Sequence, residues 1–296
     1  MRISYKPYLL PTLIFSFMFL SCKSNAELET IITVEQVGAA ATPDRIIPIE
    51  GAPFEIPQLK RPIFPDFTIN IGEKGAKTDV PITSIVNQTI EEVSQKGGGT
   101  VIIPKGKWKS GRIVLKSNVN LHLAEGSEIE FPGNAEDYLP AVFTRHEGIE
   151  IMGSGSFIYA NGEDNIAITG KGVIYGPSLN AEIRQRPNGN TVVEKDILDN
   201  APVEKRVFDG MDGRGFYKPK TISPINCTNV LIEGITMERS TFWNVCPIYC
   251  ENVIIRGITV NSIGIPSGDG IDIESCKNVL IEYLSLIHIS EPTRPY

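Results

Sequence analysis

The chain has 296 residues, of which 41% are hydrophobic and 21% charged, and its formal net charge is −7. This length suffices for one large domain with a sizeable core or for two ordinary domains. The acidic balance and the lack of a long basic run argue against nucleic acid as the main partner. An acidic chain can still bind an acidic polymer through a locally basic groove.

Residues 1–21 have the pattern of a secretory signal, with a charged start at Arg2 and Lys6 followed by an apolar run too short to span a bilayer. The segment ends in Leu20-Ser21-Cys22, which resembles a bacterial lipoprotein cleavage box. That resemblance implies a lipid on Cys22 and a place in the bacterial cell envelope, either periplasmic or on the outer-membrane surface. An ordinary cleaved signal is the alternative.

Residues 22–62 are rich in Pro, Ala, Thr and Glu and show little periodicity, which predicts a linker or stalk. A helix is predicted over 82–96, because Ile82, Val86, Ile90 and Val93 fall on one face before three glycines. A lone amphipathic helix in front of a series of strands can cover the open end of a β-solenoid.

Residues 177–219 form a long polar insertion. Long ordered loops are often functional. Basic side chains beside Phe208, Phe216 and Tyr217 would suit a groove for sugar acids, with aromatic faces for pyranose rings and cations for carboxylates. Arg214 and Lys218 are therefore candidate substrate-binding residues, although a plain solvated loop explains the composition equally well. Basic residues in and next to the insertion include Arg184, Arg186, Lys205, Arg206, Arg214, Lys218 and Lys220.

One short phrase occurs three times between residues 226 and 282. Each copy has a Cys, then Asn-Val two residues later, then alternating apolar and polar residues. The asparagines, Asn229, Asn252 and Asn278, lie 23 and 26 residues apart. A fixed period in this range indicates one structural unit stacked on itself, and the residue types favour strands over helices.

The unit fits one coil of a parallel β-helix, so equivalent residues should stack in ladders. Asn229, Asn252 and Asn278 are expected to bond to one another at a turn, because Asn tolerates left-handed backbone angles. Cys227, Cys250 and Cys276 are expected to form a second ladder of buried free thiols, since stacked neighbours rarely meet disulfide geometry. Local pairing of Cys246 with Cys250 is not favoured. No Cys/His set has zinc spacing.

The run from Ser262 to Val279, with Gly268-Asp269-Gly270-Ile271-Asp272, resembles glycoside hydrolase family 28, the pectin-cleaving polygalacturonases. The glycines and strand at 97–104, the segment 115–119 and the segment 241–253 match that family too, so the resemblance covers residues 67–283. It implies an all-β, right-handed parallel β-helix, a single-stranded solenoid with an N-terminal capping helix. It also implies inverting hydrolysis of α-1,4-galacturonan by carboxylates, without metal or cofactor.

Glycoside hydrolysis needs a protonated carboxyl and a second carboxylate that activates water or attacks. By resemblance, Asp269 is a catalytic carboxylate, and Asp272 supports the strand turn or the site from behind. Trp243 and Asn244 lie on the preceding coil and are candidate substrate contacts. The expected partner is a pectic polysaccharide or oligogalacturonide, and the protein should be a monomer that meets a membrane only through its lipid anchor.

The chain departs from the family at two places. Ser267-Gly268 stands where the family has Asn-Thr, which leaves the subgroup and the preferred linkage open. After Tyr283 the family continues to an Asp-Asp pair, a Gly-His-Gly and an Arg-x-Lys, none of which is present. Residues 284–296 resemble a translated sequencing adapter. We therefore expect a β-helix domain over 63–283 that is truncated at its C-terminal end, lacks part of its active site and is inactive.

Two other functions fit the same fold. A Ca²⁺-dependent pectate lyase would eliminate rather than hydrolyse and would yield UV-absorbing products. A non-catalytic carbohydrate-binding β-helix would bind pectin and release no reducing ends. The insertion at 177–219 also suggests a groove blocked at one end, and hence exo action.

The adapter hypothesis makes a prediction about the gene. Genomic DNA should diverge from the codons for Leu284 to Tyr296 and should continue the β-helix pattern. A genomic read that retains the Ile287-His288-Ile289-Ser290-Glu291 codons would refute it.

Overall fold

The computed structural model describes residues 42–43, 45–48, 50–51, 53 and 56–287. The contacts divide the chain into residues 1–32 and 33–296, and every described residue lies in the second unit. The signal sequence, Cys22 and the residues after Ile287 lie outside the described residues. No helix of the described part is long and apolar enough to cross a membrane.

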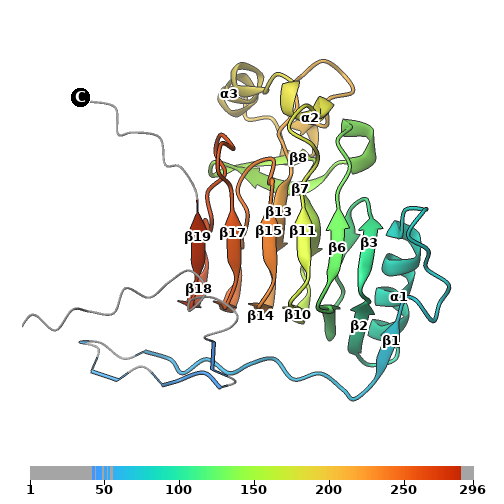
Figure 1. Ribbon diagram of the computed structural model, residues 1–296. Coiled ribbons are helices and arrows are strands. Elements are labelled where there is room, and N and C mark those ends of the chain that lie inside the picture. Colours follow the sequence, from blue (N-terminus) through green and yellow to red (C-terminus); the bar gives the residue numbers. More distant parts are fainter. Residues whose placement is uncertain (1–41, 44, 49, 52, 54–55, 288–296) are drawn as a thin grey trace, which may run out of the picture. The chain divides into compact units, whose positions relative to one another are not determined.

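The chain winds into coils whose strands stack in parallel ladders (Figure 1). The longest ladder has seven strands: β1 Thr68–Asn70, β2 Gly99–Ile103, β5 Val119–Leu123, β10 Asp164–Gly170, β14 Thr228–Glu233, β16 Glu251–Arg256 and β18 Lys277–Glu282. The second has six: β3 Gly106–Lys109, β6 Ser127–Glu130, β11 Val173–Tyr175, β15 Thr236–Glu238, β17 Thr259–Asn261 and β19 Ser285–Ile287.

A third ladder completes each coil. It consists of β4 Ile113–Val114, β9 Ser156–Asn161 and β13 Lys220–Ile225, and single bridges extend it through residues 245–248 and 271–274. This is the right-handed parallel β-helix that the sequence predicts, with strands continuing as far as Ile287. The remaining elements are α1 Thr83–Gln95, η2 Ala135–Tyr138, β7 Val142–His146, β8 Ile149–Gly153, α2 Glu182–Gln185, α3 Asn190–Leu198, η3 Val203–Lys205 and β12 Val207–Phe208.

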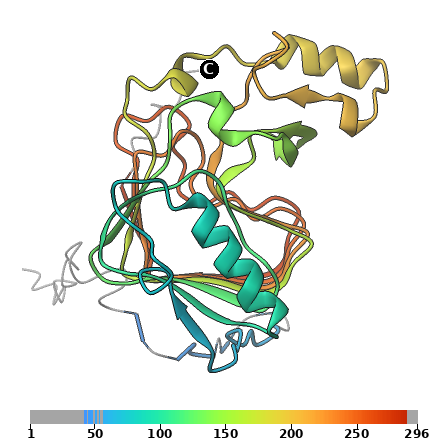
Figure 2. The same cartoon turned by 90° about the vertical axis from the view of Figure 1, so that its right-hand side faces the viewer.

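The predicted capping helix is confirmed as α1, which lies across the first coil when the β-helix is viewed end-on (Figure 2). Its inward face buries Val86, Ile90 and Val93 completely. Each buried aliphatic side chain contributes about 1.5–3 kcal/mol. The helix therefore covers the apolar end of the stack, which would otherwise meet water.

The asparagine ladder is also confirmed. Asn278 Nδ2 donates to Asn252 Oδ1 at 3.1 Å, and Asn252 Nδ2 donates to Asn229 Oδ1 at 3.2 Å. All three have positive φ, between 54° and 59°, as the turn requires. An equivalent bond joins Asn165 to Asn118 in the earlier coils, so the ladder extends beyond the visible repeat.

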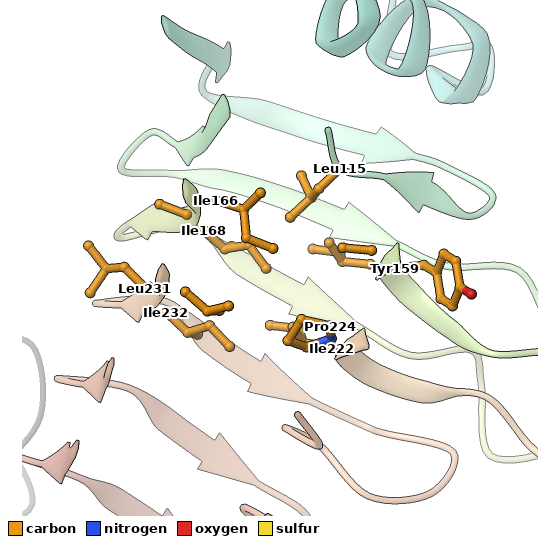
Figure 3. A pocket seen from close by; sticks show the side chains of 12 residues that line it. Leu115, Tyr159, Ile166, Ile168, Ile222, Pro224, Leu231 and Ile232 are labelled. Atoms are coloured by element: carbon orange, nitrogen blue, oxygen red, sulfur yellow. The ribbon is translucent and has the colours of Figure 1, made fainter. Parts of the chain in front are cut away.

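The cysteines of the repeat are free thiols, as expected, and so is Cys246. Cys250 Sγ lies 3.3 Å from the carbonyl oxygens of Pro224 and Ile248, and the Cys250 amide donates to Cys276 Sγ. The stack thus satisfies its own weak donors and acceptors. A small apolar gap of about 10 Å³ lies elsewhere in the interior, between side chains such as Leu115, Ile168 and Ile222 (Figure 3). It is too small and too apolar to hold a bound water.

The described part of the predicted linker packs on the β-helix. We call residues 42–43, 45–48, 50–51, 53 and 56–64 the strap. Its Ile46, Leu59 and Phe64 contact an outward-facing apolar ladder on the seven-stranded sheet. The ladder consists of Ala167, Leu231, Ile254 and Leu280. The strap therefore shields apolar surface that a stack of amphipathic strands would expose.

A buried ion triad lies beside the strap. Arg256 is 0% exposed, with Nη1 3.1 Å from Glu233 Oε1 and Nε 2.8 Å from Glu282 Oε1. The Glu282 contact is a close ion pair without hydrogen-bond alignment. Arg256 Nη2 also donates to the Pro43 carbonyl of the strap at 2.9 Å. One cation thus joins three successive coils and the segment that crosses them.

Replacing Arg256 should destabilise the fold strongly. Arg256→Met leaves the partly buried Glu282 carboxylate without its cation and removes one of the two arginines that pair with Glu233, the other being Arg61. Breaking such a buried pair costs about 3–5 kcal/mol. The free energy of unfolding in urea measures the loss. The matched control is Lys277→Met, which removes the exposed ion pair between Lys277 of β18 and Glu251 of β16. These two strands also carry Glu282 and Arg256, and the control should cost less than about 1 kcal/mol. Equal losses for the two variants would contradict this account.

Candidate active site

The loops that follow the six-stranded ladder gather at one edge of the β-helix. They include residues 239–244, residues 262–270 and the long insertion, and the β7–β8 hairpin rises from the same edge (Figure 1). Asp269 lies on the loop of residues 262–270 and is exposed to solvent. Equivalent loops of successive coils are stacked neighbours, so this edge brings residues distant in sequence together.

Asn244 holds the backbone of Asp269 in place. Its amide nitrogen donates to the Asp269 carbonyl at 2.9 Å, and its side-chain Nδ2 lies 3.0 Å from that carbonyl and 2.8 Å from Ser262 Oγ. Asn244 is 0% exposed. It therefore positions the Asp269 loop, and its complete burial leaves it no exposed surface for the predicted contact with substrate.

Close packing explains why glycines stand on either side of Asp269. A Cβ on Gly268 would lie 2.8 Å from the Ser262 Cβ, and one on Gly270 would lie 3.1 Å from a methyl carbon of Leu286. The backbone must approach its neighbours this closely for the loop to pack on Asn244. The Gly-Asp-Gly pattern thus presents a carboxylate on a tightly packed loop.

Asp272 lies behind Asp269 and is half-buried. Its amide donates to the Val245 carbonyl at 2.9 Å, while its Oδ2 is buried without a hydrogen-bond partner. Burial raises the pKa of Asp272 to about 7, and the charges of Asp269 and Glu274 add to this effect while Lys220 opposes it. The Asp272 carboxyl is therefore partly protonated near neutral pH.

Lys220, the first residue of β13, is 3% exposed. Its ammonium donates to the Arg145 carbonyl of β7 and lies 5.7 Å from the Trp243 ring centroid. Burial lowers the pKa of Lys220. Water screens such a buried cation only weakly, so its charge acts on the neighbouring Asp272, His146 and Cys246.

An aromatic stack flanks the site. The His146 ring lies 3.9 Å from that of Tyr217 and 5.0 Å from that of Phe242, and the Phe242 ring lies 4.8 Å from that of Trp243. Burial, with a smaller contribution from Lys220, lowers the pKa of His146 to about 3, so the imidazole is neutral. Trp243 is half-buried and presents an apolar surface next to the loop that carries Asp269.

The insertion has a core of its own. Phe208, Phe216 and Tyr217 are 0%, 2% and 4% exposed, so they are not the sugar-stacking faces that the composition suggested. They are buried because the insertion folds into α2, α3 and a strand that pairs with β8. Arg184 fixes it to the coil edge by donating to the carbonyls of Pro177, Ser178, Arg239 and Ser240.

The two candidate substrate-binding cations, Arg214 and Lys218, lie in different surroundings. Arg214 pairs with Asp196 and stacks on Phe208, 5.2 Å from the ring centroid, so its guanidinium is engaged within the insertion. Lys218 is half-buried, and burial followed by the charge of Arg184 lowers its pKa. The structure brings Asp269, Asp272, Trp243 and Asn244 together. Arg214 instead contacts residues of the insertion itself, namely Asp196, Val207 and Phe208.

Sequence analysis missed the β7–β8 hairpin, whose antiparallel strands interrupt the repeat. The turn residues Glu147 and Gly148 both have positive φ, which is typical of a two-residue hairpin turn. The hairpin contacts the site's coil, since Gly148 N donates to Glu274 Oε1 at 3.0 Å and Arg145 Nη1 donates to Ser275 Oγ at 3.1 Å. The sequence signal for this hairpin was Glu147-Gly148 between two runs of alternating apolar and polar residues.

Comparison with known proteins gives a consistent result, although no protein-family model matches the chain. The exo-poly-α-D-galacturonosidase of Dickeya chrysanthemi is 25% identical over 238 residues, which is 72% of this chain and 39% of that protein. The hyperthermoactive exopolygalacturonase of Thermotoga maritima superposes with a TM-score of 0.70 at 35% identity, covering 78% of this chain and 56% of that one. The family 28 exopolygalacturonase of Yersinia enterocolitica gives 0.57 at 25% identity, covering 74% and 43%.

The fold and these similarities define a polygalacturonase-like parallel β-helix protein. The chain is a homologue of the exo-polygalacturonases of glycoside hydrolase family 28. It spans between 39% and 56% of the length of the three relatives named.

The raised pKa of Asp272 predicts a pH-dependent stability difference. Because the folded-state pKa of about 7 exceeds the ordinary value of 3.8, the folded state binds the proton more tightly than the unfolded state. Stability from this group is therefore present at low pH and is lost as pH rises from about 4 through about 7.

Asp272→Asn mimics the protonated carboxyl and should match wild type near about pH 4 and have a higher Tm near about pH 8. Thermal unfolding across this range measures the difference, with exposed Asp66→Asn as a control for a surface Asp-to-Asn change. A wild-type-to-variant difference that stays constant with pH would contradict the assignment.

Proposed function

We propose that the protein containing this chain hydrolyses α-1,4-linked galacturonate in pectic polysaccharide or oligogalacturonide. The observation that carries the proposal is Asp269, an exposed carboxylate on a loop fixed by buried Asn244, with Asp272 behind it and Trp243 beside it. The names of the relatives, galacturonosidase and exopolygalacturonase, support hydrolysis over the lyase and non-catalytic alternatives.

In the proposed reaction Asp269 acts as a base toward water, or shares one proton with neighbouring carboxyls, and the leaving oxygen is protonated by a second acid. Inverting enzymes place their two carboxyl groups about 6.5–9.5 Å apart to admit that water. The resemblance assigns the second acid to an aspartate pair one coil beyond Asp269. We accordingly expect the 296-residue chain alone to be inactive, since it carries no such pair after Tyr283.

Exo action is the form of hydrolysis that we favour. The insertion, fixed through Arg184, and the β7–β8 hairpin, fixed through Arg145 and Gly148, both rise at the edge that carries Asp269. Such walls would close one end of a groove, so that only a chain terminus could enter. The relatives are exo-acting by name.

We further propose that the protein is a monomer in the bacterial cell envelope, attached through a lipid on Cys22. The Leu-Ser-Cys pattern after an apolar run supports the lipid anchor and the envelope location. Metabolic labelling with a radioactive fatty acid tests it, because Cys22→Ser should abolish the label.

Replacing Asp269 should strongly reduce turnover. In protein extended by the genomic sequence after Tyr283, Asp269→Asn should lower kcat on polygalacturonate by about 100-fold or more with little change in KM, since general acid–base groups contribute about 10²–10⁴-fold. A reducing-end assay measures the rate, with Asp66→Asn as the control. Monomer as the first product would support exo action. Products that absorb in the ultraviolet, or an unchanged kcat, would refute the assignment.

A further inference from the structure

One arginine side chain closes the start of the long insertion. Arg184 lies on α2, at the edge of the β-helix where loops follow the six-stranded ladder (Figure 1). Its Nε donates to the Ser178 carbonyl at 3.0 Å, and its Nη2 donates to the Pro177 carbonyl at 3.0 Å. These acceptors are the first two residues of the insertion, so the guanidinium fixes α2 to the point where the insertion leaves the coil.

The same guanidinium also reaches the coil that follows. Arg184 Nη2 donates to the Arg239 carbonyl at 2.7 Å, and Nη1 donates to the Ser240 carbonyl at 2.9 Å. Two bonds thus go to the insertion and two to the loop of residues 239–244. The guanidinium is planar and holds its donors in a fixed fork, which suits it to join two backbone segments.

The backbone that offers these two carbonyls has an unusual conformation. Arg239 has a φ of +56°, in the left-handed region that residues other than glycine seldom adopt. A Cβ on Gly176 would lie 2.0 Å from the Arg239 carbonyl oxygen, so this turn also packs tightly on the preceding coil. Strained backbone of this kind persists only where its surroundings fix it. The hydrogen bonds from Arg184 are part of that fixation.

Ser240 connects the turn to the loop that carries Asp269. It is 1% exposed, and its Oγ lies 3.2 Å from Asn244 Nδ2 and 3.5 Å from Ser262 Oγ. Asn244 Nδ2 in turn lies 3.0 Å from the Asp269 carbonyl. A continuous series of hydrogen bonds therefore runs from the insertion, through the loop of residues 239–244, to the backbone of Asp269.

We propose that Arg184 is a positioning residue of the Asp269 site, which ties the folded insertion to residues 239 and 240 and so holds Ser240 and Asn244 where they fix the Asp269 loop. Its relevance to catalysis rests on the proposed hydrolysis, but the tie itself does not. Small displacements of a catalytic group can lower a rate by about 10²-fold, so the firmness of this loop matters for turnover.

Hydrogen exchange followed by NMR on the 296-residue chain tests the tie. The Asn244 amide donates to the Asp269 carbonyl at 2.9 Å, so its exchange rate reports how firmly the two loops are held together. Arg184→Met should raise this rate about tenfold or more, which is the effect of losing one hydrogen bond to a charged group. A wild-type rate at Asn244 in folded Arg184→Met overturns the proposal.

Two further variants separate positioning from a general loosening of the insertion. Arg206 also donates to backbone carbonyls, those of Ala201 and Glu150, but it fixes the insertion to β8. Arg206→Met is therefore the matched control and should leave the Asn244 rate unchanged, and an equal rise there would overturn the proposal. Arg184→Lys should give an intermediate rate, since an ammonium cannot reproduce the planar fork. If Arg184→Met does not fold, a wild-type rate in Arg184→Lys overturns the proposal.

Kinetics then distinguish this inference from the proposed function. In protein extended by the genomic sequence, Arg184→Met should lower kcat on polygalacturonate by about tenfold or more with little change in KM, because the catalytic group is misplaced. A raised KM with an unchanged kcat would instead make the insertion a binding element and overturn the positioning role.

The two proposals can fail separately. If the extended wild-type protein does not hydrolyse polygalacturonate while Arg184→Met still speeds exchange at Asn244, the function is refuted and the tie stands. If hydrolysis occurs and both kcat and the Asn244 rate are insensitive to Arg184→Met, the tie is refuted and the function stands.

Discussion

Stacking of identical positions one strand spacing apart is the constraint on which the structure depends. It aligns Asn229, Asn252 and Asn278 so that each amide bonds to the next, and it aligns the thiols of the same repeat. It also places Arg256 between Glu233 and Glu282, where a single unlike residue in a ladder becomes a link between coils. In a solenoid every residue has a copy of its neighbourhood above and below, so departures from the repeat mark special positions.

The site is such a departure. In each coil a loop follows the strand of the six-stranded ladder. This loop is short in the first coil, contains the β7–β8 hairpin in the second and contains the long insertion in the third. Asn244 and Asp269 then occupy the loops of the next two coils, joined through the Asp269 backbone. A rigid stack thus holds an exposed carboxylate, and its irregular loops supply the surroundings. Buried Lys220 belongs to the stack itself, since it begins a strand of the third ladder.

Sequence reasoning recovered the features that repeat. The Asn and Cys ladders, the capping helix and the β-helix itself followed from period and residue type. The catalytic role of Asp269 rests on family resemblance and stays a prediction. It misjudged Phe208 and Tyr217, because an aromatic residue in a polar insertion has the same composition whether it is buried or exposed. It grouped Lys220 with loop cations, although that residue begins a strand whose six positions are all buried. Such facts depend on contacts between segments far apart in sequence, which period cannot reveal.

The strap has a consequence for the order of assembly. Its Pro43 carbonyl meets Arg256, 213 residues later, and its Ile63 carbonyl meets Asn165, 102 residues later. The ribosome synthesises the strap before the β-helix, yet the strap's binding surface includes Arg256 of the fifth coil and Leu280 of the sixth. Contacts of such long sequence separation are slow to form. The strap therefore docks late in folding, although it precedes every coil in the sequence.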